Sequence, residues 1–105
     1  MNVSSKLSPV AQANEIREGE MQVVDVAGSK VALTRIDGHL HAFDDACTHA
    51  GCSLASGELD GTVVSCPCHG SRFDVTSGAV LRGPARRPVR RYVVRTEGED
   101  VLVEP

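Results

Sequence analysis

Two short stretches of the chain each place a cysteine and a histidine at a spacing that suits metal binding. Cys47 and His49 form a Cys-x-His pair, Cys66 and His69 form a Cys-x-x-His pair, and sixteen residues lie between His49 and Cys66. Two thiolates and two imidazoles can complete the tetrahedral shell of a zinc ion, so the ligand types alone leave the metal open. The Cys-x-His spacing is unusual for zinc, however, and each stretch supplies one sulfur and one nitrogen.

The residues around the two pairs narrow the choice of metal centre. Residues 47–52 read Cys-Thr-His-Ala-Gly-Cys, and residues 66–74 read Cys-Pro-Cys-His-Gly-Ser-Arg-Phe-Asp. Together they closely resemble the motifs of the Rieske iron–sulfur family, and the resemblance covers nearly the whole chain. In that family two cysteines hold one iron of a [2Fe–2S] cluster and two histidines hold the other. The resemblance therefore implies one Rieske cluster per chain, with iron ligands Cys47, His49, Cys66 and His69.

The same resemblance assigns roles to residues beside the expected ligands. Cys52 and Cys68 stand where Rieske proteins of cytochrome bc complexes have a disulfide, and Ser71 matches a hydroxyl that hydrogen-bonds a bridging sulfide. Phe73 stands where those proteins have a tyrosine whose hydroxyl bonds a ligand sulfur. Such hydrogen bonds stabilise the more negative, reduced cluster, so the missing hydroxyl predicts a lower reduction potential. We expect a value between those of dioxygenase ferredoxins and bc-complex proteins.

Two of these assignments have alternatives. Disulfides are rare in the cytosol, and the chain shows no export signal, so Cys52 and Cys68 are otherwise two buried thiols or part of a second metal site. Gly83 and Pro84, with Pro88 beyond them, fall where Rieske proteins have a proline-containing loop that shields the cluster. Without the resemblance, the prolines would indicate only an irregular loop between strands.

The remaining sequence predicts an all-β framework for these loops. Valine-rich stretches alternate with turn signals at Gly28-Ser29, Asp37-Gly38 and Asp60-Gly61. One helical turn is expected over residues 14–18. The resemblance implies a Rieske-like β-sandwich, with a two-loop cluster-binding subdomain over about residues 44–83 of a single domain, 1–105. The strands are expected at residues 21–27, 30–36, 39–43, 62–65, 92–96 and 100–103.

Composition limits the classes of partner. The 105 residues have a net charge of −3, which argues against nucleic acid. No apolar stretch approaches the length of about 18 residues that a membrane span needs, and no targeting signal is visible, so we expect a soluble, cytoplasmic protein. Electron carriers usually work as transient monomers, so we also expect a monomer. Seven arginines fall between Arg72 and Arg95. They are either a solvated face or, through Arg82, Arg86 and Arg87, a docking patch near the electron exit.

These observations favour a Rieske-type ferredoxin, a one-electron carrier without a catalytic site of its own. It would pass electrons from a flavin-dependent NAD(P)H reductase to the terminal oxygenase of an aromatic-ring-hydroxylating system. Oxygenases of the superfamily hold a second iron with two histidines and a carboxylate. Only His39 and His41 remain here, both expected to face solvent on a strand. The alternatives are a relative or fragment of a bc-complex or arsenite-oxidase-type Rieske subunit, and a redox-sensing regulatory module.

Overall fold

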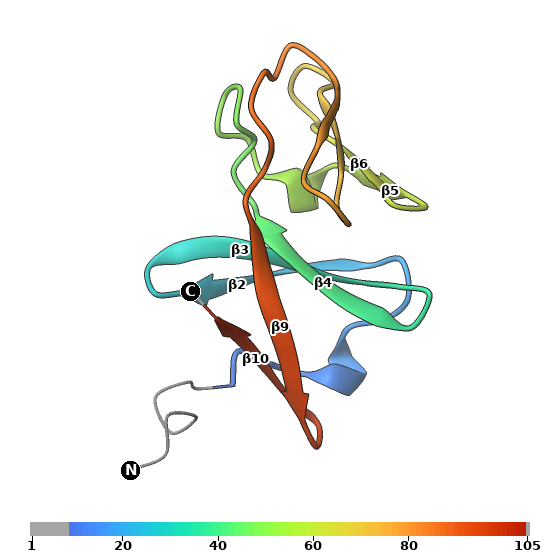
Figure 1. Ribbon diagram of the computed structural model, residues 1–105, viewed down its shortest axis with the longest axis vertical. Helices are drawn as coiled ribbons and strands as arrows, with labels where there is room; N and C mark the ends of the chain where they lie inside the picture. Colours follow the sequence, from blue (N-terminus) through green and yellow to red (C-terminus); the bar gives the residue numbers. More distant parts are fainter. Residues whose placement is uncertain (1–8, 105) are drawn as a thin grey trace.

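The computed structural model describes residues 9–104, which form two antiparallel β-sheets and two single turns of 3-10 helix (Figure 1). The order in the six-stranded sheet is β1-β10-β9-β4-β3-β2, and in the four-stranded sheet β5-β6-β7-β8. This arrangement confirms the predicted fold class. The strands are β1 (Ala11–Gln12), β2 (Met21–Val26), β3 (Ser29–Ile36), β4 (His39–Asp44), β5 (Glu58–Asp60), β6 (Val63–Ser65), β7 (Arg72–Asp74), β8 (Val80–Arg82), β9 (Arg91–Glu97) and β10 (Asp100–Glu104); the helical turns are η2 (Ala13–Glu15) and η3 (Leu54–Ser56).

The six-stranded sheet forms the base of the molecule, and its long strand β3 contributes to two cores. Val31 and Leu33 pack with β2, β9 and β10, whereas Ala32 and Ile36 belong to a second buried cluster shared with the smaller sheet. Side chains alternate between the two faces of a strand, so a strand covered on both faces is apolar along most of its length. This explains why three consecutive apolar residues of β3, Val31, Ala32 and Leu33, are all buried.

The hairpins of the base depend on residues with positive φ. Asp37 and Gly38, with φ of 51° and 80°, form the turn predicted between β3 and β4. The turn between β2 and β3 was predicted one residue too late. It lies at Ala27 and Gly28, with φ of 50° and 87°, and Ser29 already pairs with Val26. A two-residue turn with positive φ at both positions suits a glycine at the second one, which Gly28 occupies.

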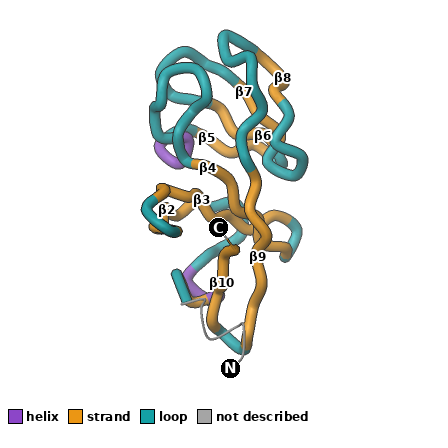
Figure 2. Tube along the Cα trace, turned by 60° about the vertical axis from the view of Figure 1, so that its left-hand side comes forward, coloured by secondary structure: helices purple, strands orange, loops and turns teal. Residues whose placement is uncertain are grey.

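The four-stranded sheet lies at the opposite end of the molecule from the β9–β10 turn, and loops make up much of that end (Figure 2). Its strands have only three residues each, and β5, β7 and β8 were not predicted. The molecule measures 45 × 25 × 19 Å, so this loop-rich end stands at one tip of a long axis. Within residues 9–104 there is no helix with the length and apolar character that crossing a membrane would require.

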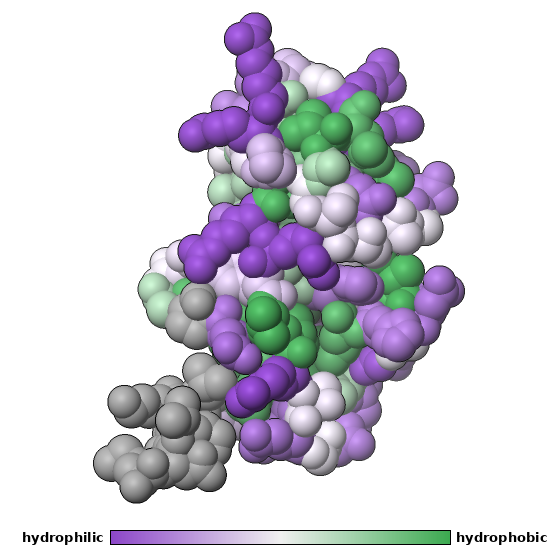
Figure 3. All heavy atoms as spheres, in the orientation of Figure 1, coloured by the Kyte–Doolittle hydropathy of each residue, from purple (hydrophilic) through white to green (hydrophobic). Residues whose placement is uncertain are grey.

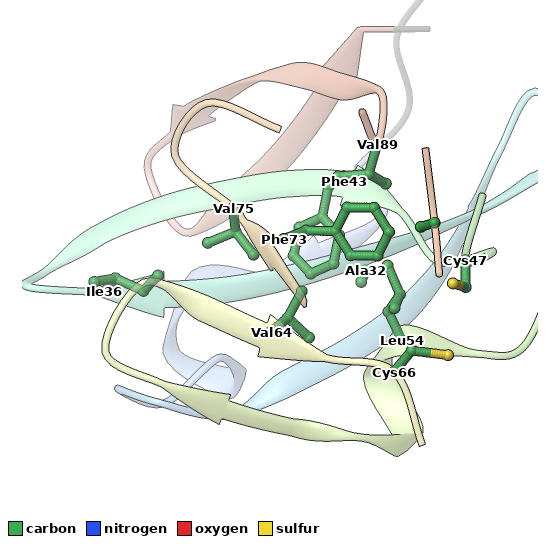
Figure 4. Close-up of a cluster of buried hydrophobic side chains, with 11 residues drawn as sticks. Ala32, Ile36, Phe43, Cys47, Leu54, Val64, Cys66, Phe73, Val75 and Val89 are labelled. Atoms are coloured by element: carbon green, nitrogen blue, oxygen red, sulfur yellow. The ribbon is translucent and has the colours of Figure 1, made fainter. Parts of the chain in front are cut away.

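A second buried cluster joins the two sheets beneath the loops (Figure 4). Phe43 comes from β4 of the base, while Val64 and Phe73 come from β6 and β7 of the smaller sheet, and none of the three is accessible to solvent. Cys47 and Cys66 belong to the same cluster, at its edge in Figure 4. The hydrophobic core therefore extends to the two free thiols.

Candidate metal centre

The first loop, residues 47–52, is closed by two backbone hydrogen bonds. The Cys47 N–H donates to the Cys52 carbonyl at 2.9 Å, and the Gly51 N–H donates to the Cys47 carbonyl at 2.8 Å. Gly51 has φ of 77°, a left-handed conformation that glycine adopts without steric cost. The sequence Cys-Thr-His-Ala-Gly-Cys therefore folds into a tight loop that fixes the cysteine at its base.

The second loop, residues 66–71, repeats this backbone pattern. The Cys66 N–H donates to the Ser71 carbonyl at 2.8 Å, the Gly70 N–H donates to the Cys66 carbonyl at 3.1 Å, and Gly70 has φ of 79°. Each loop thus starts with a cysteine and has its positive-φ glycine four residues later. The histidine is the third residue of the first loop and the fourth of the second, and the second cysteine is the sixth residue of the first loop and the third of the second.

The loops turn their sulfur atoms inward and their imidazoles outward. Cys47 and Cys66 are free thiols with exposed fractions of 3% and 4%. His49 and His69 are exposed, and their ring centroids lie 5.1 Å apart with an interplanar angle of 80°. The structure therefore places the two thiols in one buried cluster and the two imidazoles beside each other at the surface.

A disulfide joins the two loops. Cys52 and Cys68 are bonded, with their Cα atoms 6.4 Å apart, as the resemblance to bc-complex proteins implies. The Sγ atom of Cys66 lies within 4.8 Å of both disulfide sulfurs. Because two of these three sulfurs are already bonded to each other, Cys66 alone offers a thiolate there. A separate three-cysteine metal site does not form.

The segment that contains Gly83 and Pro84 packs beside both loops. The Ser71 hydroxyl oxygen, which is completely buried, accepts a hydrogen bond from the Ala85 N–H at 3.0 Å. A hydroxyl that accepts in this way still has its own proton to donate. The Thr48 hydroxyl donates to the Arg87 carbonyl at 2.8 Å.

The contacts of Thr48 and Ala85 were not predicted, because they join residues that are far apart in the sequence. Gly83 and Pro84 themselves are exposed. The hydrogen bonds at Thr48 and Ser71 therefore place this segment against both loops.

Gly57 is a positioning residue that the sequence pattern did not reveal. A Cβ atom placed on Gly57 would lie 1.9 Å from the Ser65 carbonyl oxygen and 3.2 Å from Cδ of Pro67. Ser65 and Pro67 flank Cys66, so the missing side chain lets the chain after η3 approach the start of the second loop. The need for glycine at position 57 is visible only from the distance to Ser65 in the folded chain. In the sequence, Gly57 follows a turn, where glycine is common for other reasons.

The other two histidines lie on β4 and differ in exposure. His39 is exposed, as predicted. The prediction for His41 was wrong, because its Nδ1 atom is buried and has no hydrogen-bond partner within residues 9–104. Burial lowers the pKa of His41, and the charges of Arg91 and His39 lower it further, while Asp74 opposes the shift. The face of β4 that carries His41 is therefore partly covered.

The donors fit a [2Fe–2S] cluster with mixed ligation. Two buried thiols suit sulfide-bridged iron, and two imidazoles on the solvent side complete the set of four ligands. The Ser71 hydroxyl has a proton that it can donate to a bridging sulfide. A β framework with two such loops defines a class of iron–sulfur proteins. The chain belongs to the Rieske [2Fe-2S] domain family, whose match covers residues 6–93, and its cofactor is a Rieske-type [2Fe–2S] cluster.

Relatives and solved structures refine this class. The chain is 37% identical over 90 residues to the ferredoxin component of the naphthalene 1,2-dioxygenase system of Pseudomonas aeruginosa, covering 86% of each chain. It is similar to the ferredoxin of carbazole 1,9a-dioxygenase from Nocardioides aromaticivorans IC177, with a TM-score of 0.89, 33% identity and coverage of 94% and 97%. It is also similar to a chain in a complex of reduced oxygenase and oxidized ferredoxin of carbazole 1,9a-dioxygenase, with a TM-score of 0.86, 32% identity and coverage of 92% and 91%.

Proposed function

We propose that this Rieske protein is a soluble one-electron carrier that links a flavin-dependent NAD(P)H reductase to the terminal oxygenase of an aromatic-ring-hydroxylating system. The observation that carries the proposal is the pair of exposed imidazoles, His49 and His69, 5.1 Å apart at the tip of the molecule. A redox centre at a protruding tip suits a transient encounter with two different partners. The similarity to dioxygenase ferredoxins over most of the chain supports the same role.

Cys47 and Cys66 would hold one iron of the cluster, and His49 and His69 would hold the other. The cluster supplies a one-electron couple, which Rieske ligation places at roughly −150 to +300 mV. The two cysteines anchor it at the edge of the core, and their burial excludes water from the sulfur side. The two imidazoles bring the path for the electron to the surface. Both imidazoles are exposed, so their remaining ring nitrogens are placed to contact a partner.

We further propose that the chain has no catalytic site of its own. The ferredoxin components that it resembles serve as parts of dioxygenase systems. Once His49 and His69 are assigned to the cluster, only His39 and His41 remain for a second iron. We place the protein in the cytoplasm as a monomer, with residues 1–105 acting as one domain.

The first test is a redox titration followed by visible absorbance and low-temperature EPR, with iron, sulfide and zinc assayed on the same sample. A rhombic spectrum in the reduced state is expected. Zinc in place of iron, in a protein purified without loss of iron, would refute the site. A midpoint near the upper end of the Rieske range, about +300 mV, would favour the alternative of a bc-type relative.

The second test measures electron delivery in turnover. The purified chain is combined with an NAD(P)H reductase and with each member of a panel of ring-hydroxylating terminal oxygenases. Product formation that depends on the chain, over many turnovers per chain, is expected with at least one oxygenase. A redox-sensing module would support no sustained turnover with any of them. Absence of turnover with every oxygenase of the panel would therefore refute the carrier function.

A further inference from the structure

The charges of the chain are distributed unevenly along the long axis. Residues 81–90 contain four arginines and no acidic residue, whereas residues 97–104 contain four acidic residues and no basic one. The first segment lies at the loop-rich tip and the second, in β9 and β10, belongs to the base (Figure 1). The tip is therefore the more basic end of a protein whose net charge is −3.

Two of these arginines lie at the proposed electron exit. A shallow surface depression is lined by Thr48, His49, Pro84, Arg86 and Arg87, so both guanidinium-bearing residues share a surface with an exposed imidazole. In Figure 3 hydrophilic side chains project from this end of the molecule. A partner that approaches His49 closely enough to accept an electron must therefore meet Arg86 and Arg87.

These arginines remain available to a partner. Among residues 9–104 the ion pairs are Lys30–Asp25 and Arg95–Glu104, both on the base, so Arg86 and Arg87 have no carboxylate partner in the described part of the chain. An exposed guanidinium without a partner presents several donors that match the geometry of a carboxylate.

The backbone that carries them is held in place on both sides. The Thr48 hydroxyl donates to the Arg87 carbonyl at 2.8 Å, and the Ala85 N–H donates to Ser71 at 3.0 Å. Ala85 and Val89 are buried and fasten the segment to the second core. A fixed backbone reduces the ordering that binding must impose, so these positive charges are arranged before any partner arrives.

We propose that Arg86 and Arg87 form a basic docking surface beside His49 that selects a terminal oxygenase with an acidic docking face. The inference rests on the proposed function and adds the charge that the partner must carry. The acidic docking face of the oxygenase would repel the acidic segment 97–104. The ferredoxin would therefore approach the oxygenase with its loop-rich tip first. Charge complementarity of this kind acts mainly on the rate of association and on the choice of partner.

The test uses the holoprotein with the oxygenase that supports turnover. Arg86→Glu and Arg87→Glu are each expected to raise KM for the ferredoxin about tenfold at low ionic strength, with kcat unchanged at saturation. At about 0.5 M salt, where the Debye length is only a few ångströms, the difference should shrink to within about twofold. Arg17→Glu makes the same change of charge at an exposed site on the base, and it should leave KM within about twofold of the wild type at every salt concentration.

A second measurement needs no partner protein. The reduced holoproteins are reoxidised in stopped flow by ferricyanide, an anion, and by tris(phenanthroline)cobalt(III), a cation. Arg86→Glu and Arg87→Glu should slow the reaction with the anion and speed that with the cation, each by about threefold or more, and Arg17→Glu should do neither. EPR spectra and midpoints equal to those of the wild type establish that each variant has the same cluster.

The outcomes separate the two proposals. If no oxygenase turns over with the wild-type chain, the carrier function fails, and with it the oxygenase as the partner of this surface. If turnover occurs but neither arginine variant changes KM at low salt, the carrier function stands and the acidic docking face is refuted. If each oxidant reacts with both arginine variants at the same rate as with the wild type, the two arginines do not control electron transfer near His49. This result would also refute the basic docking surface.

Discussion

The base and the loop-rich tip are stabilised in different ways. Strands of the base reach eight residues, as in β3, and pack around a core of their own. Every strand of the tip has three residues, and its loops depend on a disulfide, on buried hydrogen bonds to Ser71, and on a close approach at Gly57. Short strands bury little apolar surface, and a metal centre can supply the missing stabilisation. The tip is therefore the region whose folding depends most on the cofactor.

Loss of the cluster should give the largest difference in stability between the tip and the base. Cys66→Ser removes one proposed ligand, so iron content and visible absorbance are expected to fall to background. Metal binding contributes directly to the folding of its site. Amides of β6 and β7 should therefore lose protection in hydrogen exchange, while amides of β3 and β4 keep it. Loss of protection in both sheets together would show that the base cannot fold alone.

Gly57→Ala is the next largest perturbation, and it acts without removing a ligand. The new Cβ would lie 1.9 Å from the Ser65 carbonyl oxygen, so the backbone before Cys66 must move. Overpacking of this kind costs about 1–3 kcal/mol or more. We expect a lower iron content and, in the fraction that retains the cluster, shifted EPR g-values. Gly83→Ala is the matched control, since its Cβ has no neighbour closer than 3.8 Å. Equal effects of the two variants would contradict a positioning role for Gly57.

The disulfide should stabilise the tip and leave the base unchanged. Cys52 and Cys68 are 16 residues apart, and closing a loop of that length is worth about 3 kcal/mol in the chain-entropy account. The cluster links the same two loops, so this figure is an upper limit for the holoprotein. Cys52→Ala/Cys68→Ala should lower the temperature at which the visible absorbance bleaches. Wild type treated with a reductant should match it, and an unchanged bleaching temperature in both samples would mean that the cluster alone secures the loops.

Phe73→Tyr tests the polarity of the tip rather than its stability. A new hydroxyl that reaches a ligand sulfur would favour the reduced cluster by about 1 kcal/mol, which for a one-electron couple corresponds to a rise of roughly 40 mV in the midpoint. Phe43→Tyr places the same hydroxyl in the same buried cluster from the base side, and it should reduce stability without raising the midpoint. A midpoint for Phe73→Tyr at or below that of the wild type, in a voltammetric titration, would contradict this reading of Phe73.

The base was the more predictable region. Its long strands are rich in valine and other apolar residues and end at turn residues such as Asp37 and Gly38, and both signals are local. The strands of the tip were mostly missed, because three residues give too short a pattern and their pairing depends on the loops around them. The four candidate ligands were found through their motifs. Gly57 and the Thr48 contact were not, because both depend on distances between segments that are remote in sequence.

The position of His41 shows the same limit on a single strand. Alternation places His39 and His41 on one face of β4, but it does not reveal that another part of the chain covers one end of that face. The nearby charges that shift the pKa of His41 belong to Arg91 at the start of β9, to His39, and to Asp74 of β7 in the tip. His41 therefore reports on the contact between the two regions.

The smallest expected effect is a pH dependence of stability through His41. Its pKa in the folded protein is lowered from 6.5, so the unfolded chain binds this proton more tightly. As the pH falls through about 6.5 toward the folded pKa, protons favour the unfolded state and the free energy of unfolding decreases. The pKa of Asp74 is lowered from 3.8, chiefly by the Thr76 hydroxyl, so the stabilisation from that carboxylate is lost only at much lower pH.

His41→Gln should remove this component between about pH 5 and 8, whereas His39→Gln at the exposed end of the strand should retain it. His49 and His69 are present in both variants, so the two variants differ only in which histidine of β4 is replaced. Thermal unfolding of the base, followed by far-UV circular dichroism across this range, measures the difference. If wild type and His41→Gln lose stability in parallel on acidification, the pKa of His41 is not lowered in the folded protein, and the prediction is wrong.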